Sequence, residues 1–163
     1  MSETLTRSRA APRPALDANL GYLFRLAHQR FRALLEDELS DVGLSVQEYA
    51  ILSVFETRSE LSTSELARIT QVTRQTMHTA ILRLEGAGLL KRQARNRRVV
   101  LVTLTRLGAA ALRRATKRVR VVEHAAVAGL SRRDERAVRE WLARLAAVPA
   151  DLVQDDVERR KKP

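Results

Sequence analysis

The sequence predicts a mainly α-helical fold that carries one small β-hairpin. Three observations lead to this prediction. Apolar residues recur at helical spacing through most of the chain, serine and threonine residues stand where helices would begin, and one stretch near residue 100 has the β-branched composition of a strand. The hydrophobic fraction of 45% over 163 residues suffices for a compact core, so we expect a globular protein.

The first half of the chain is expected to begin with a flexible arm over residues 1–15, which contain two prolines and no apolar period. A long amphipathic helix is predicted over 17–39. A second helix is predicted from about Ser45 to Thr57, because Ser45 followed by Glu48 forms a capping box, in which each side chain bonds the other residue's backbone N–H.

Two shorter helices and a hairpin are predicted next. Ser62 and Glu65 form a second capping box, which opens a helix that ends near Ile69. After a turn at Gln71 and Val72, Thr73 caps a helix that reaches about Glu85. Strands are predicted over 89–94 and 98–104, joined by the polar tip Arg95-Asn96-Arg97.

The chain is predicted to close with two helices. One starts near Thr105 and runs to about Ala128, and the other starts after the cap Ser131 and stops before Pro149. Residues 149–163 are expected to form a tail. We therefore expect a single domain over 16–148, in which residues 45–104 hold the short helices and the hairpin.

The order of helix, turn, helix and basic hairpin is the layout of a winged helix-turn-helix. An α-helix fits the major groove of DNA, and arginine and glutamine can each read a base through two hydrogen bonds. An arginine on the hairpin, or wing, can enter the minor groove. The residues predicted to contact DNA are Ser62, Thr73, Arg74, Gln75, Thr76, His78, Thr79, Arg83, Arg92, Arg95, Asn96, Arg97 and Arg98.

The charge distribution favours the same partner. Lysine and arginine number 30 against 19 acidic residues, which gives a net charge of +11 and indicates either a nucleic acid or an anionic membrane surface. Between Thr70 and Val100 the only acidic residue is Glu85, whereas seven residues are basic. The positive charge is thus concentrated on the two elements predicted to face DNA.

Simpler interpretations exist for each element taken alone. A polar helix face is usually a solvated face, and a basic hairpin is often an edge strand protected by its charge. Two other classes of protein also compete with a sequence-specific regulator. One is an architectural protein that binds DNA of any sequence. The other is a module that docks proteins on its winged helix, which the base-reading side chains of Arg74 and Gln75 argue against.

Several classes of function are excluded or disfavoured. The absence of cysteine excludes disulfides and thiolate zinc sites. No apolar run reaches eighteen residues and the N-terminus lacks a signal sequence, so we expect a cytoplasmic protein that does not enter membranes. His28, His78 and His124 are too far apart to predict a metal site. No catalytic motif or cofactor-binding loop is present, so an enzyme is the least supported class.

Residues 17–147, approximately, resemble one known family. Three stretches carry the resemblance: GLSVQEYAIL, LSTSELARITQVTRQTMHTAILRLEGAGLLKR and RRVVLVTLTRLG. They are similar to the MarR family of bacterial transcription regulators. The most specific pieces are Leu84-Glu85 followed by Gly88-Leu89, and residues 102–105 followed by Gly108. The resemblance implies an obligate homodimer joined through helices 17–39 and 105–147, a recognition helix at 73–86 and a wing at 91–98.

The resemblance also implies an operator and an effector. A twofold dimer places its recognition helices about 34 Å apart, so the double-stranded operator is expected to be pseudo-palindromic. Many members of the family bind aromatic acids, which predicts a repressor released by a small aromatic or phenolic effector. The candidate effector-binding residues are Phe24, Arg25, His28, Arg32 and Tyr49. The wing departs from the family pattern, because Asn96 stands where an acidic residue is common and the tip is shorter.

Overall fold

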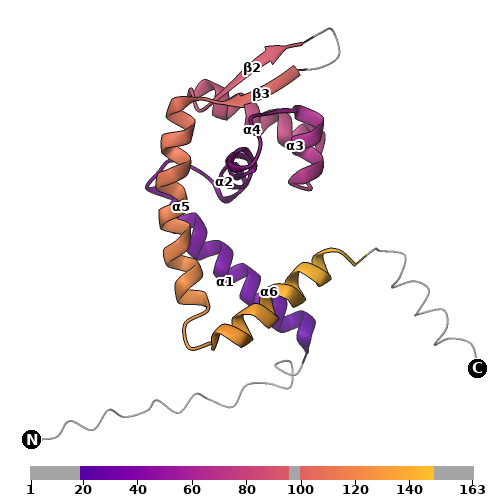
Figure 1. Cartoon of the computed structure of the whole chain (residues 1–163), viewed down its shortest axis with the longest axis vertical. Coiled ribbons are helices and arrows are strands. Elements are labelled where there is room, and N and C mark those ends of the chain that lie inside the picture. Colours follow the sequence, from indigo (N-terminus) through magenta and orange to yellow (C-terminus); the bar gives the residue numbers. More distant parts are fainter. Residues whose placement is uncertain (1–18, 96–99, 149–163) are drawn as a thin grey trace, which may run out of the picture. The chain divides into compact units, whose positions relative to one another are not determined.

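The computed structural model describes residues 19–95 and 100–148, which form a mainly helical protein with a small antiparallel sheet (Figure 1). Contacts divide the chain into two compact units, one ending at Glu123 and the other starting at His124. The single domain expected over 16–148 stays a prediction. No helix of the described part is long and apolar enough to cross a membrane.

The helices confirm the boundaries expected from the sequence to within a few residues. The N-caps Ser45, Ser62, Thr73 and Ser131 each accept a hydrogen bond from a backbone N–H three residues later. The second predicted helix is shorter than expected, because its last turn tightens into a 3-10 helix at Val54–Glu56. The helices are α1 (Leu20–Ser40), α2 (Val46–Ser53), α3 (Thr63–Ile69), α4 (Arg74–Gly86), α5 (Arg106–Ala126) and α6 (Arg132–Ala146).

The sheet contains one strand that the sequence did not indicate. β2 (Leu90–Ala94) and β3 (Val100–Leu104) form the predicted hairpin, and β1 (Glu60–Ser62) pairs with the other edge of β3. In this register Leu61 lies opposite Val102, and both side chains are buried. Three residues in a polar stretch carry no strand pattern, so β1 forms because β3 offers it an unpaired edge.

The core of the first unit draws on every one of its helices and on the sheet. Leu39, Leu52, Leu66, Ile81 and Val102 are all less than 2% exposed. The apolar side of α4 packs into this core, while its other side stays in solvent. The core therefore fixes which face of α4 is presented outward.

Gly108 lies where α5 passes closest to the start of the hairpin. A Cβ at this position would stand 2.1 Å from the carbonyl oxygen of Leu89. That oxygen already accepts hydrogen bonds from the backbone N–H of Thr105, at 3.1 Å, and from its hydroxyl, also at 3.1 Å. A backbone carbonyl held in this way cannot move aside easily, so only glycine fits.

We expect Gly108→Ala to destabilise the protein by about 2 kcal/mol, within the range for inserting a methyl group into a packed site. Gly86→Ala is the matched control, because Gly86 also lies in a helix but has nothing within 4 Å of an added Cβ. That control should be neutral or slightly stabilising. Urea unfolding measures both variants, and equal free energies of unfolding would show that α5 can move away from the hairpin.

Candidate nucleic-acid interface

The helix-turn-helix is formed by α3 and α4. Glu65 and Ser62 complete the capping box that begins α3, and the Thr73 hydroxyl accepts a hydrogen bond of 3.1 Å from the backbone N–H of Thr76. The turn between the helices holds Gln71 at a φ of 54°, a conformation that side chains rarely adopt. These local bonds set where the first turn of α4 begins.

The two faces of α4 differ sharply. Met77, Ile81 and Leu84 are at most 1% exposed and face the core. The opposite side carries exposed polar side chains that can donate to or accept from nucleic-acid bases and phosphates. They include five predicted contact residues: Arg74, Gln75, Thr76, His78 and Thr79. The structure thus brings these five together on one exposed surface.

Two open grooves border this surface. One, of about 430 Å³, lies between the start of α2 and α4 and is lined by side chains of Gln47, Gln75 and Thr79 among others. The second, also of about 430 Å³, runs between α3 and the first turn of α4, where Arg68 and Arg74 both line it. Arg68 was not among the predicted contact residues. Its position beside Arg74 depends on how α3 and α4 pack, which residue spacing does not reveal.

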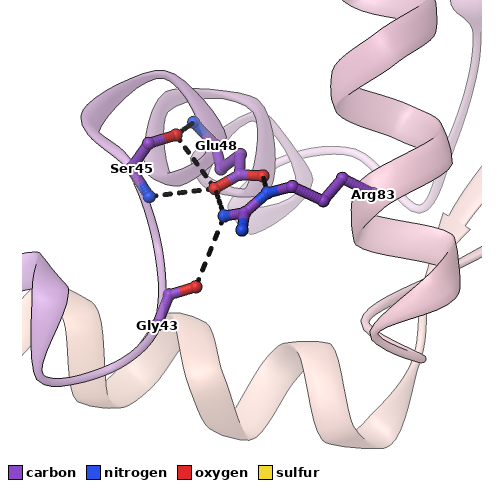
Figure 2. A network of polar contacts seen from close by, with 4 residues as sticks. All are labelled: Gly43, Ser45, Glu48 and Arg83. Atoms are coloured by element: carbon purple, nitrogen blue, oxygen red, sulfur yellow. Dashed lines mark hydrogen bonds and ion pairs between the residues drawn. The ribbon is translucent and has the colours of Figure 1, made fainter.

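Arg83 on α4 is engaged by a carboxylate from α2. Its Nε and Nη2 atoms donate to the two carboxylate oxygens of Glu48, and Nη2 also lies 3.5 Å from the carbonyl oxygen of Gly43 (Figure 2). Glu48 is the only charged residue of the described part that is buried, at 3% exposure. Its oxygen Oε2 also accepts hydrogen bonds of 2.9 Å from the N–H and the hydroxyl of Ser45.

The surroundings of Glu48 hold it in the charged form. Burial pushes the pKa of Glu48 upward, but the hydrogen bonds from Arg83 and Ser45 and the charge of Arg83 outweigh burial, so the net pKa lies below its ordinary value of 4.5. The same contact raises the pKa of Arg83. The ion pair is therefore fully charged at neutral pH.

We expect the ion pair to make stability depend on pH in the acid range. Because folding lowers the pKa of Glu48, its stabilising contribution is present above about pH 4.5, its value in the unfolded chain, and is lost as the pH falls through the lower folded pKa. Glu48→Gln keeps the shape of the capping box and removes this titration. Thermal unfolding of both proteins from pH 7 to pH 3 should show a gap in melting temperature that closes with falling pH. A gap that is constant across this range would contradict the expected charged pair.

The wing is joined to α4 by a second ion pair. Arg92 on β2 donates from Nε to Oε2 of Glu85 at 2.6 Å, and both side chains are about one third exposed. Lys91 on the same strand and Arg95, which directly follows it, are exposed. The predicted contacts Asn96, Arg97 and Arg98 lie outside the described residues, so the wing tip stays a prediction.

The candidate effector-binding residues lie on α1 and α2. Arg25 donates to Gln29 at 3.2 Å and stacks over the ring of Tyr22, and Arg32 pairs with Glu36 at 2.8 Å. These interactions run along α1 and are exposed. The other three candidates are Phe24 and His28, which are exposed on α1, and Tyr49, which is partly buried on α2 and packs against the core.

No group of three histidine, aspartate or glutamate side chains in residues 19–95 and 100–148 is placed to hold a metal ion. The exposed residues of α4 instead form a surface of hydrogen-bonding and cationic side chains around a helix whose first turn is exposed. Such a surface matches the edges of bases and the phosphates of a duplex. The fold and this surface define a winged-helix DNA-binding protein.

Comparison with known proteins gives the family. The MarR family profile matches residues 42–98. The HTH-type transcriptional repressor Rv2887 of Mycobacterium tuberculosis is 34% identical over 133 residues, which is 80% of this chain and 96% of that protein. This chain belongs to the MarR family.

Solved structures agree with this assignment. A probable transcriptional regulator from Pseudomonas aeruginosa has a TM-score of 0.73 at 30% identity, covering 80% of this chain and 98% of that one. Rv2887 in complex with DNA has a TM-score of 0.66 at 34% identity, covering 79% and 98%. Rv2887 in complex with salicylic acid has a TM-score of 0.62 at the same identity, covering 79% and 97%.

Proposed function

We propose that the protein is a transcription repressor that binds a specific DNA sequence and is released by a small aromatic acid. The observation that carries this proposal is the set of exposed polar side chains of Arg74, Gln75 and His78 in the first half of α4, a helix whose apolar side is fully buried. Such a helix can enter the major groove with its polar side leading. The Mycobacterium tuberculosis repressor supports it, since that relative has been crystallised with DNA.

Within this proposal the residues divide by role. Arg74, Gln75, His78 and Thr79 lie on the outward side of α4 and read base edges. The caps Ser62 of α3 and Thr73 of α4, and Thr76 in the first turn of α4, lie near the helix N-termini and contact phosphates. Arg95 and the residues of the wing tip, Asn96, Arg97 and Arg98, contact the minor groove.

We propose that the active species is a homodimer. The first half of α1 exposes Leu20, Leu23, Phe24 and Leu26 at 39–64%, and α6 exposes Val138, Leu142 and Leu145 at 39–42%. Apolar side chains at helical spacing on two helices are typical of an interface, because a soluble monomer rarely exposes such stripes. A twofold dimer then calls for a pseudo-palindromic operator.

The effector is proposed by analogy with the same relative, which was also crystallised with salicylic acid. A carboxylate needs a cation, and Arg25 and Arg32 on α1 provide two, which contact Gln29 and Glu36 of the same helix at its exposed surface. Phe24, His28 and Tyr49 complete the proposed set. In this proposal the protein acts on double-stranded DNA in the cytoplasm and carries out no catalysis.

Selection of bound sequences from a random duplex pool tests the DNA-binding proposal. We expect an enriched site with imperfect twofold symmetry, bound at least about 10³-fold more tightly than random duplex, the low end for specific regulators. Comparable binding to the selected and random duplexes would instead identify an architectural protein, whose affinity the net charge of +11 would explain. Salicylate added to the complex should lower the affinity, and Arg32→Ala should reduce that response.

A further inference from the structure

The position of Arg83 suggests a direct DNA contact. Gln75, Thr79 and Arg83 follow one another at four-residue spacing, so they form one stripe along α4. All three line the groove between α4 and the start of α2. Judged by spacing and exposure alone, Arg83 would be the third DNA-facing residue of this stripe.

The contacts of Arg83 point to a different role. The guanidinium binds both oxygens of Glu48, which is the strongest geometry available to an arginine and a carboxylate. The side chain of Glu48 is 4% exposed, whereas that of Arg83 is 61% exposed. If Arg83 turned toward a phosphate, it would leave a buried carboxylate without its cation, which is strongly unfavourable.

The ion pair joins two elements that are distant in sequence. Glu48 lies in the first turn of α2 and is fixed there by Ser45, while Arg83 lies in the last turn of α4. Two residues further along α4, Glu85 forms an ion pair with Arg92 on β2, in which α4 supplies the acidic partner instead of the basic one. The end of α4 is therefore joined to α2 through the cation of Arg83 and to the wing through the carboxylate of Glu85.

We infer that Arg83 is a positioning residue, whose ion pair with Glu48 sets the rotation of α4 about its axis and so the reach of its base-reading side chains. This inference rests on the proposed DNA-binding function and deepens it. Arg83 itself then pairs its charged guanidinium with Glu48 and makes no contact with a phosphate. Specificity for the operator then depends on a buried carboxylate of α2.

Binding of variants to the selected operator and to random duplex, at several salt concentrations, tests the inference. The variants are Glu48→Gln, Arg83→Met and the double variant, which remove the charges but keep unbranched aliphatic stems. Arg139→Met is the matched control, because Arg139 is equally exposed, at 60%, and pairs with Glu135 within α6 alone. This control variant removes one positive charge, as Arg83→Met does, but it breaks no ion pair between two different elements. All measurements are made well below each variant's melting temperature.

We expect Glu48→Gln and Arg83→Met each to lower the ratio of operator to random binding by at least about fivefold, the smaller cost of losing one base contact. The double variant should be no worse than the worse single variant, since both remove the same pair. The slope of affinity against salt should stay unchanged.

A phosphate-contacting Arg83 would give the opposite pattern, which would overturn the inference. Glu48→Gln would then free the cation and strengthen binding to both duplexes, and Arg83→Met would reduce the salt slope by about one ion. Arg83→Lys, which keeps the charge, would retain binding in that case but lose specificity if Arg83 positions the helix. If the wild-type protein itself does not discriminate the duplexes, the proposed function fails instead.

Discussion

Leu142→Asp should dissociate the dimer and lower affinity for a two-half-site operator by about 10²-fold or more, the gain that linking two binding modules provides. The reason is the apolar stripe of α6, in which Leu142 is 39% exposed between Val138 and Leu145. A carboxylate on this stripe would be buried without a partner in the dimer but would stay hydrated in the monomer. The variant should therefore fold and fail to associate.

Ala143→Asp is the matched control for this prediction. It introduces the same charge on the same helix, but the helical repeat puts position 143 on the side of α6 away from the stripe, and Ala143 is exposed. Sedimentation velocity gives the oligomeric state of both variants, and titration of the selected operator gives their affinities. If Leu142→Asp sediments as a dimer, α6 does not form the interface.

Arg74→Ala should cost about 1–3 kcal/mol of binding to the operator and relax the sequence preference at one position, as expected for the loss of a two-bond base contact. Arg74 is the first residue of α4 and is exposed, so it leads the helix into the groove. Binding to random duplex should fall less, because nonspecific affinity comes from phosphates. The ratio of operator to random binding is the quantity to measure.

Arg95→Ala provides the comparison. Arg95 is also exposed and its replacement removes the same charge, but it lies directly after β2, on the wing. In the minor groove the pattern of donors and acceptors is degenerate, so its loss should weaken binding to both duplexes alike and make the salt slope shallower by about one. An unchanged specificity ratio for Arg74→Ala would show that α4 is not the recognition helix.

The elements that the sequence predicted correctly are those encoded by neighbouring residues. Ser45 with Glu48 and Ser62 with Glu65 form their capping boxes at the expected three-residue spacing, with the backbone and side-chain bonds both present. The predicted strands appear as β2 (Leu90–Ala94) and β3 (Val100–Leu104), which pair with each other, and in β3 the β-branched composition favours extended backbone. These interactions close within one turn of helix or one hairpin, so the order of residues is enough to reveal them.

The candidate site was predicted only in part. Spacing placed Arg74, Gln75 and His78 on the solvent side of α4, because the apolar positions of a helix fix its other face. Spacing also counted Arg83 and Arg92 as DNA contacts, but their partners could not be known. Exposure of a side chain can be expected from a helical pattern, whereas the group that it meets cannot.

The sequence alone thus determined the helices with their caps, the hairpin and the outward face of α4. Only the tertiary structure decided that β1 would pair with β3, that Gly108 would lie against the carbonyl oxygen of Leu89, and that Glu48 would pair with Arg83. The last contact joins residues 35 positions apart. Nothing local favours one such pairing over another, since the packing of α2 against α4 in a shared core selects which charged groups meet.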